Sequence, residues 1–330
     1  MPPTLSSGWT QCFPPAPGFT EKDIPNLSGK VYIVTGATSG VGKELAQMLY
    51  SKNAKVYIAA REEGNTIKDL KNAEPTSTGA LSFLRIDLED LRSVKAAAER
   101  FTASETRLNV LFNNAGYLAP DTNNVEKTVQ GFEKQLGVNC LGPFLLTKLL
   151  TPTLLATAAE KNPTSWTNEV RVVFVSSFAA EMYYEKHIGI NLDNLDYHIP
   201  KPSIHRYGLS KVGVWANGIE FTKRFKDRGI FGVNVNPGNL RTDLFSRQGF
   251  LFRLQVALMH YEPAKGAYTE LFAGLSPEVT PDKAAYVFPF GRILPICKDL
   301  QNAAKPEKQG GANLTEKFWQ WCEEQVVEFL

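Results

Sequence analysis

Short apolar runs alternate along the chain with longer stretches whose apolar residues recur at helical spacing. The runs rich in β-branched and aromatic residues, which predict strands, are Val31–Thr35, Lys55–Ala60, Leu81–Ile86, Leu108–Asn113, Val170–Ser176 and Phe231–Asn236. The helical spacing covers Gly42–Lys52, Asp90–Ala103, Val125–Leu155 and His205–Lys226. Strands that alternate with helices are joined by right-handed crossovers, so the pattern predicts an α/β fold with one doubly wound parallel sheet and helices on both faces.

Two long segments interrupt this alternation. Residues 178–204 contain His, Tyr, Asn and Pro with no clear period, and residues 243–262 are rich in phenylalanine. Irregular segments of this length are usually functional, so we interpret both as substrate-lid segments, although the phenylalanines would also suit an ordinary core. We expect an extended N-terminal arm over 1–28 and a single domain over 29–330 that closes with a helix at 314–329.

The composition excludes several classes of protein. Lys and Arg total 36 against 34 Asp and Glu, and this near-balance gives no electrostatic footprint for nucleic acid. The four cysteines are widely spaced with no C-x-x-C pair, so we expect neither a disulfide framework nor a zinc site. The N-terminus has no apolar signal-peptide core, and the apolar stretch Phe144–Ala159 is too short to span a bilayer. We expect a cytoplasmic protein without a membrane span.

A glycine-rich turn, TGATSGVG, follows the first predicted strand and opens the first helix. Small residues there let the backbone approach a pyrophosphate, and the helix N-terminus offers free N–H groups and the positive end of its dipole. Glycines also mark turns without a ligand, but the position in the first βα unit favours a nucleotide site. Its candidate residues are Gly36, Ser39, Gly40, Val41 and Gly42.

The end of the second strand indicates which nucleotide binds. An acid there would bond the ribose 2′-hydroxyl of NAD, whereas this chain has Arg61, which can pair with the 2′-phosphate of NADP. The neighbouring Glu62 and Glu63 leave a second interpretation open, a solvated surface arginine. Asp87, which ends the third strand, suits either the adenine amino group or a helix cap. We expect NADP(H) as the cofactor.

The chain resembles the short-chain dehydrogenase/reductase family over about residues 28–245. The motifs that carry the resemblance occur in the family's order: the glycine-rich turn, Asn113-Asn114-Ala115-Gly116, Asn139, the serines 176–177, Tyr207-x-x-x-Lys211, and Pro237-Gly238 with Thr242. Within the family the chain is similar to the retinol-dehydrogenase-like and WW-domain-oxidoreductase-like branch, and its ends look like those of fungal members. The resemblance implies a Rossmann-type fold.

Tyr-x-x-x-Lys occurs three times, and one copy fits a catalytic pair. The copies that start at Tyr197 and Tyr261 each enclose a proline, which disrupts the helical geometry that places Lys beside Tyr. The copy formed by Tyr207 and Lys211 can be a helical turn and follows the serine-bearing strand. We expect Tyr207 to exchange a proton with substrate, and the positive charge of Lys211 to lower the pKa of its phenol.

Two further groups complete the catalytic set that the resemblance implies. Ser177 would bond the substrate oxygen and polarise its carbonyl, with Ser176 as a close rival. Asn139 would hold a water that returns protons to Lys211, and the alternative is an amide that bonds backbone inside a helix. About 30 residues separate Ser177 from Tyr207, far more than is common in the family, which leaves the placement of the helix start open.

The resemblance also implies the rest of the site, with plain turns as the alternative interpretation. The residues expected along the adenosine ribose are Asn114, Ala115 and Gly116. Those expected around the nicotinamide are Pro237, Gly238, Leu240 and Thr242. Lone histidines in loops are more often solvated than functional, but the polar candidates for substrate contact are His187, His198 and His205.

These features predict an NADP(H)-dependent oxidoreductase that interconverts a carbonyl and an alcohol on a fairly apolar small molecule. By analogy with fungal look-alikes, that molecule is a secondary-metabolite intermediate. Two other classes stay open: a cofactor-binding sensor without turnover, and a non-redox isomerase or cyclase that binds NADPH without consuming it. Relatives commonly dimerise through the helices that flank Asn139 and Tyr207, so we also consider a homodimer.

Overall fold

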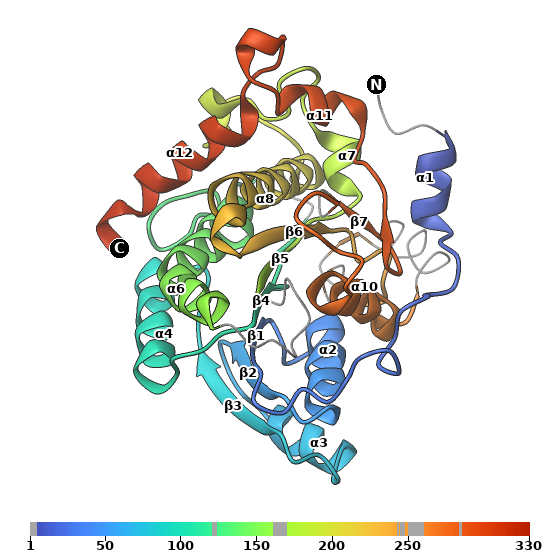
Figure 1. Cartoon of the computed structure of the whole chain (residues 1–330). Helices are drawn as coiled ribbons and strands as arrows, with labels where there is room; N and C mark the ends of the chain where they lie inside the picture. The colour runs from blue at the N-terminus through green and yellow to red at the C-terminus, as the bar shows by residue number, and fades with distance from the viewer. Residues whose placement is uncertain are drawn as a thin grey trace.

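The computed structural model describes residues 5–120, 124–160, 170–242, 244, 248–249, 261–283 and 286–330. Within this part of the chain one eight-stranded sheet has the order β3-β2-β1-β4-β5-β6-β7-β8 (Figure 1). The strands are β1 (Val31–Thr35), β2 (Lys55–Ala60), β3 (Ala80–Arg85), β4 (Val110–Asn113), β5 (Arg171–Val175), β6 (Phe231–Val235), β7 (Val287–Phe288) and β8 (Arg292–Ile293). All neighbours pair in parallel except β7 and β8, which are antiparallel. The predicted doubly wound sheet is confirmed.

Helices cover both faces of this sheet. One face carries α2 (Gly40–Ser51) and α10 (Pro263–Leu275), and the other carries α4 (Leu91–Ser104), α6 (Gly142–Ala159) and α8 (Ser203–Phe225) (Figure 1). The shorter α3 (Thr66–Ala73) connects β2 to β3. Alternate residues of β1 serve the two faces, because side chains point to opposite sides along a strand: Val31 and Ile33 join one hydrophobic cluster, Tyr32 and Val34 the other.

The long helical region predicted from Val125 starts later than expected. Residues 124–133 form turns in which Gly131 has a φ of +88°, a left-handed conformation that ends any helix. The helix begins as α5 (Lys134–Leu136), passes through a π-helical turn at Gly137–Leu141 and continues as α6. Single π-turns inside helices frequently occur at functional sites, and this one carries Asn139.

Segments outside the alternating core add further helices. The sequence predicts an extended N-terminal arm, whereas in the structure the helix α1 (Leu5–Cys12) forms within it. The segment 178–204 contains α7 (Ala179–Tyr183) and a short 3-10 turn at Leu192–Asn194. The C-terminal part contains α11 (Lys298–Ala303) and α12 (Leu314–Val326), and α12 lies next to α8 in Figure 1. Most of the predicted lid segment 243–262 lies outside the described residues.

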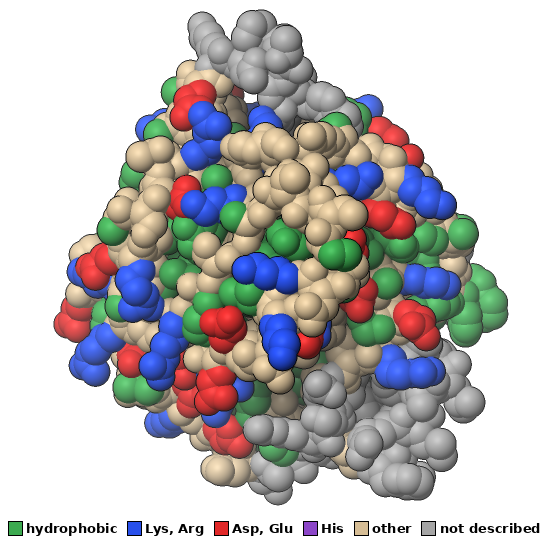
Figure 2. All heavy atoms as spheres, turned by 90° about the horizontal axis from the view of Figure 1, so that it is seen from below, with side chains coloured by type: hydrophobic (Ala, Val, Ile, Leu, Met, Phe, Trp, Pro, Cys, Tyr) green, Lys and Arg blue, Asp and Glu red, His purple; other side chains and the backbone are tan. Residues whose placement is uncertain are grey.

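The surface and the most apolar helix bear on possible partners. On the face seen in Figure 2, basic and acidic side chains are interspersed over the described surface, and neither sign dominates. Among the described helices one stretch, Lys134–Ala159, is long and apolar enough to cross a membrane by length and composition, but 67% of its most apolar window is buried inside the fold. Core helices pass the same test, so this stretch is weak evidence for a membrane span.

Candidate active site

A cleft of about 860 Å³ lies where the parallel strands end, beside the point at which the strand order reverses between β1 and β4. Ligands bind at such switch points in open α/β sheets. All the predicted catalytic and cofactor-binding residues except Gly42 and Asn139 line this cleft. Lining residues that the sequence analysis did not single out include Thr38, Tyr117, Leu118, Lys134 and Val175.

Gly36 and Gly42 of the glycine-rich turn lie where a larger side chain would not fit. Gly36 has a φ of +68°, and a Cβ there would lie 3.1 Å from the Cα of Ala115. A Cβ at Gly42 would come within 2.5 Å of Asn114 Nδ2, the amide that donates to the Thr35 carbonyl at 2.7 Å. Gly42 therefore shapes the site by close packing behind the turn. Because the side chain of Ser39 does not cap α2, the N–H groups of its first turn stay available to a ligand.

The rim of the cleft at β2 and β3 carries the residues expected to choose the nucleotide. Arg61 follows β2, is exposed and lines the cleft together with Glu62. Asp87 follows β3, and its Oδ1 accepts from the Glu89 N–H at 3.0 Å. The cap of α4 is Asp90, whose side chain accepts from the N–H of Arg92, so Asp87 is not the helix cap that we considered.

The opposite end of the cleft is formed after β6. Gly238 has a φ of +99°, and the Asn236 side chain accepts from its N–H at 3.0 Å. The chain then returns toward the glycine-rich turn, where Thr242 Cγ2 lies 3.3 Å from the position of a Cβ at Gly40. Pro237, Leu240 and Thr242 line the cleft here. Residues far apart in the sequence thus form one continuous wall.

Tyr207 and Lys211 lie on α8, where this helix packs beside the end of β5 and the serines that follow it. Lys211 Nζ donates to the Val175 carbonyl at 2.8 Å and lies 5.6 Å from the centre of the Tyr207 ring. The Tyr207 side chain hydrogen-bonds that of Ser177. The spacing of four residues places Lys211 beside Tyr207 on one face of α8, as the sequence predicts.

Burial sets the protonation of this pair. It raises the pKa of Tyr207 to about 12, partly offset by the hydrogen bond with Ser177. It also lowers the pKa of Lys211 to about 8, against the opposing influence of Cys140 and Glu270. The expected lowering of the Tyr207 pKa is therefore wrong for this structure, because burial disfavours the charged phenolate. At neutral pH a neutral phenol lies beside a mostly protonated ammonium.

The geometry separates the two serines that the sequence left as rivals. Ser176 is buried, and its Oγ donates to the Lys211 carbonyl at 2.8 Å. Ser177 is half-buried and carries the hydroxyl that bonds Tyr207. Its carbonyl accepts from the Tyr286 hydroxyl at 3.2 Å, which fixes its backbone. Ser177 therefore presents its hydroxyl beside Tyr207, whereas Ser176 ties β5 to α8.

Asn139 lies behind the cleft wall. Its Oδ1 accepts from the Tyr117 N–H at 2.7 Å, and its Nδ2 donates to the Tyr117 carbonyl at 3.0 Å and to Ser210 Oγ at 2.9 Å. This is the backbone-bonding arrangement that we weighed against a water-binding role. Asn139 thereby joins the loop after Gly116 to α8, and a Cβ at Gly116 would lie 3.3 Å from Lys211 Nζ.

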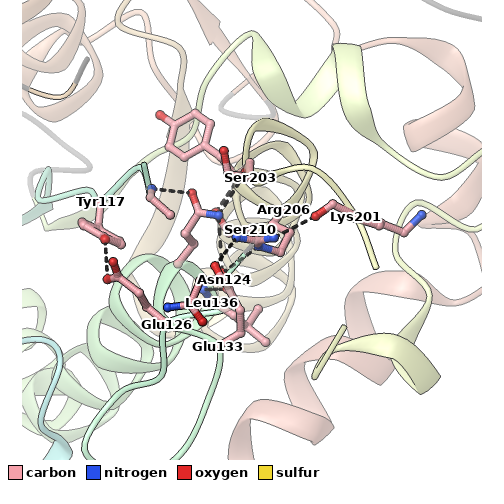
Figure 3. A network of polar contacts seen from close by, with 12 residues as sticks. Tyr117, Asn124, Glu126, Glu133, Leu136, Lys201, Ser203, Arg206 and Ser210 are labelled. Carbon is pink, nitrogen blue, oxygen red and sulfur yellow. Dashed lines mark hydrogen bonds and ion pairs between the residues drawn. The ribbon is translucent and has the colours of Figure 1, made fainter. Parts of the chain in front are cut away.

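A buried polar network fixes the start of α8 (Figure 3). Arg206, the residue before Tyr207, is 2% exposed, and its guanidinium donates to the Lys201 carbonyl at 2.7 Å and to the Asn124 carbonyl at 3.3 Å. Its Nε lies 3.4 Å from a carboxylate oxygen of the buried Glu133. The network positions Tyr207 despite the long segment that precedes it. No short motif joins these residues, so sequence reasoning missed them.

The candidate histidines do not line the cleft. His205 packs against Tyr183 with tilted rings whose centres are 4.6 Å apart, and His198 Nδ1 bonds Asp196 on the surface. The N–H of His187 donates to Asp299 at 2.9 Å. No residue of 178–204 lines the cleft, because this segment packs against α8 and the C-terminal helices.

Comparison with known proteins establishes the family. A family model described as short chain dehydrogenase matches residues 30–189. The short-chain dehydrogenase/reductase bet4 of Neocamarosporium betae is 48% identical over 99% of this chain and 94% of that protein. A short-chain dehydrogenase/reductase of Phomopsis amygdali is 46% identical over 99% of this chain and 98% of that protein. The chain belongs to the short-chain dehydrogenase/reductase family, a family of oxidoreductases.

Solved structures support the fold. An NADPH-bound carbonyl reductase from chicken fatty liver matches with a TM-score of 0.57 and 21% identity, over 82% of this chain and all of that one. A 3-ketoacyl-(acyl-carrier-protein) reductase from Brucella melitensis in complex with NADH matches with a TM-score of 0.58 and 22% identity, over 77% of this chain and 95% of that one. At these identities the likeness concerns the arrangement of the sheet and helices.

Proposed function

We propose that this protein is an NADP(H)-dependent reductase or dehydrogenase that interconverts a carbonyl and an alcohol on an apolar small molecule. The observation that carries the proposal is the meeting of Ser177, Tyr207 and Lys211 in the same cleft as the glycine-rich turn and Arg61. A proton donor and a nucleotide cradle in one cleft provide what carbonyl reduction needs.

The roles of the side chains follow from their contacts. A bound nicotinamide cofactor supplies the hydride. In the reducing direction the substrate oxygen is held beside Ser177 and Tyr207, and the Tyr207 hydroxyl gives its proton to that oxygen as it gains charge. The ammonium of Lys211 stabilises the phenolate that remains. The phenol whose pKa burial raises to about 12 is fully protonated at neutral pH, the form that this direction requires.

The cleft fits a dinucleotide phosphate. The backbone at Gly36 and Gly42 forms a cradle that a Cβ would fill, and the N-terminus of α2 favours a pyrophosphate. The exposed guanidinium of Arg61 would pair with a 2′-phosphate, which supports NADP(H) over NAD(H). The similar solved structures include one described with NADPH and one with NADH, so they favour neither nucleotide. The preference for NADP(H) therefore rests on Arg61.

Less specific features complete the proposal. The proposal keeps a secondary-metabolite intermediate as the substrate, by analogy with the fungal members that the sequence resembles, and a cytoplasmic location. A homodimer through α6 and α8 has to accommodate α12, since Trp319 of α12 packs edge-on against Phe144 of α6. The sensor is not favoured, because a protein that only binds the cofactor does not need a proton donor bonded to Ser177. Membership of an oxidoreductase family disfavours the isomerase or cyclase.

The test is turnover of NADPH with a panel of apolar ketones and aldehydes, such as acetophenone and benzaldehyde. We expect loss of the reduced-nicotinamide absorbance in proportion to the alcohol formed. Product formed without loss of NADPH would indicate a non-redox enzyme, and tight NADPH binding without turnover across a broad panel would indicate a sensor.

A further inference from the structure

The N-terminal helix α1 docks beside the catalytic segments through one buried side chain. Gln11 is 2% exposed, although it lies in an arm that precedes the first strand. Its Oε1 accepts from Asn236 Nδ2 at 2.8 Å, and its Nε2 donates to Glu181 Oε2 at 3.3 Å. A buried amide is costly unless it is hydrogen-bonded, and here both its donor and its acceptor are used.

The two partners of Gln11 flank the catalytic residues from opposite directions. Asn236 directly follows β6 and precedes Pro237, and its Oδ1 accepts from the Gly238 N–H at 3.0 Å. Glu181 lies on α7, directly after the strand end that carries Ser177. Both partners are buried, with exposed fractions of 2% for Asn236 and 1% for Glu181. Gln11 is therefore a bridge between the turn at the nicotinamide end and the segment that follows the catalytic serine.

Further contacts hold α1 at this place. The guanidinium of Arg292 donates to the carbonyl of Thr10 at 2.7 Å and also bonds the Thr10 hydroxyl. A Cβ at Gly8 would lie 3.8 Å from the ring of Phe178, the residue after Ser177. Figure 1 shows α1 beside β7 and α7, away from the cofactor-side helix α2. The side chain of Trp9 on the same helix is 67% exposed.

We propose that α1 is an integral part of the substrate end of the cleft and that Gln11 is a positioning residue for catalysis. Its two hydrogen bonds hold the Pro237–Gly238 turn and the segment after Ser177 at a fixed separation. This inference rests on the proposed function for its kinetic consequence, but the bridge itself is a property of the fold. Loss of the bridge leaves the buried Asn236 amide and Glu181 carboxyl without this partner, so both segments gain freedom to move.

The experiment compares Gln11→Leu, which keeps the size of the side chain but removes both hydrogen bonds, with Trp9→Ala as a control on the exposed face of α1. Hydrogen exchange of the full-length variants is measured over 178–183 and 236–242. Turnover is measured with NADPH and the most active ketone or aldehyde of the panel, and NADPH binding by calorimetry. A pair at the partner position, Glu181→Gln and Glu181→Leu, tests the same bridge if Gln11→Leu does not fold.

The bridge predicts faster exchange in both segments for Gln11→Leu and no change for Trp9→Ala. It also predicts a loss of about 10- to 100-fold in kcat, with NADPH affinity unchanged. Glu181→Gln, which keeps an acceptor for Gln11, should retain activity that Glu181→Leu loses. Unchanged exchange, or unchanged kcat in Gln11→Leu, would overturn the inference while leaving the reductase intact. Absence of turnover in the wild type would instead refute the proposed function, and the exchange measurement would still decide on the bridge.

Discussion

The two ends of the cleft are built in different ways. The cofactor end consists of turns that directly follow β1, β2, β3 and β4, so its residues are supplied by consecutive strands of the first half of the sheet. The substrate end combines the end of β5, the start of α8 and the turn after β6 with contacts from α1 and the C-terminal part. The first end depends on local backbone shape, the second on packing between distant segments.

This difference separates what is common to the family from what is particular to this chain. A nucleotide presents the same phosphates and ribose to every member, and a short glycine-rich turn is sufficient to meet them. A particular substrate needs a particular wall, which this chain builds from segments outside the region 30–189 matched by the family model as well as from inside it. Substitutions at the cofactor end should therefore change nucleotide affinity, whereas those at the substrate end should change kcat.

The largest expected effect comes from the proton donor. Tyr207→Phe should lower kcat by about 10²- to 10⁴-fold, because the hydroxyl that gives the proton is removed. NADPH affinity should be nearly unchanged, as the cofactor end keeps its turns. Turnover assays measure kcat, and calorimetry measures the affinity for NADPH. Tyr197→Phe, at a tyrosine that does not line the cleft, is the matched control. Loss of NADPH binding in Tyr207→Phe would show that the two ends are not separable.

The serine pair provides the next test. Ser177→Ala should lower kcat by about 10²- to 10³-fold, since it removes the hydroxyl that bonds Tyr207 and that, in the proposed reaction, would bond the substrate oxygen. Ser176→Ala is the matched control, and because its hydroxyl bonds the Lys211 carbonyl, it should lower thermal stability more than kcat. Steady-state kinetics and melting curves of both variants are needed. The reverse ranking in kcat would assign the catalytic role to Ser176.

A smaller effect, confined to the cofactor end, is expected from Arg61. Arg61→Ala should raise the Kd for NADPH about 10- to 100-fold, because a charge-assisted contact with the 2′-phosphate is lost. The Kd for NADH should hardly change. Arg92→Ala, an exposed arginine on α4, is the control for a general loss of positive charge. An equal rise for both nucleotides would remove Arg61 from the 2′-phosphate role.

The smallest effect concerns stability and a buried carboxyl on α10. Glu270 on α10 is fully buried, and burial raises its pKa from 4.5 to about 8. Because the fold binds this proton more tightly than the unfolded chain does, stability falls as pH rises from about 4.5 to about 8. Glu270→Gln should raise the Tm by a few degrees at pH 8 and by less at pH 5. The exposed Glu262→Gln should show no such trend, and a Tm gain in Glu270→Gln that does not depend on pH would contradict the assignment.

The sequence predicts the features that depend on neighbouring residues better than those that depend on packing between distant segments. Hydrophobic periodicity finds β1 to β6. Short motifs and the family resemblance predict the glycine-rich turn, Arg61 and the Tyr207–Lys211 pair, which line one cleft in the structure. Periodicity misses β7 and β8, which are two residues each and pair only through tertiary contact. Such short strands leave no periodic signal.

The misses at the substrate end have the same origin. Gln11 meets Asn236, and Arg206 meets Glu133, across separations that no local motif encodes. The lid role expected for 178–204 rests on its irregular pattern and stays a prediction, whereas the packing of this segment against α8 and the C-terminal helices could not be predicted from that pattern. The pKa of Tyr207 likewise depends on its burial in the assembled fold, which the spacing of Tyr and Lys does not reveal.

The most direct test of the account is a calorimetric titration of the full-length protein with NADPH and with NADH. The account predicts saturable binding of NADPH with a Kd about 10- to 100-fold lower than that for NADH, because only NADPH carries the phosphate that Arg61 would bind. No binding of either nucleotide would contradict the central claim that this cleft is a cofactor site.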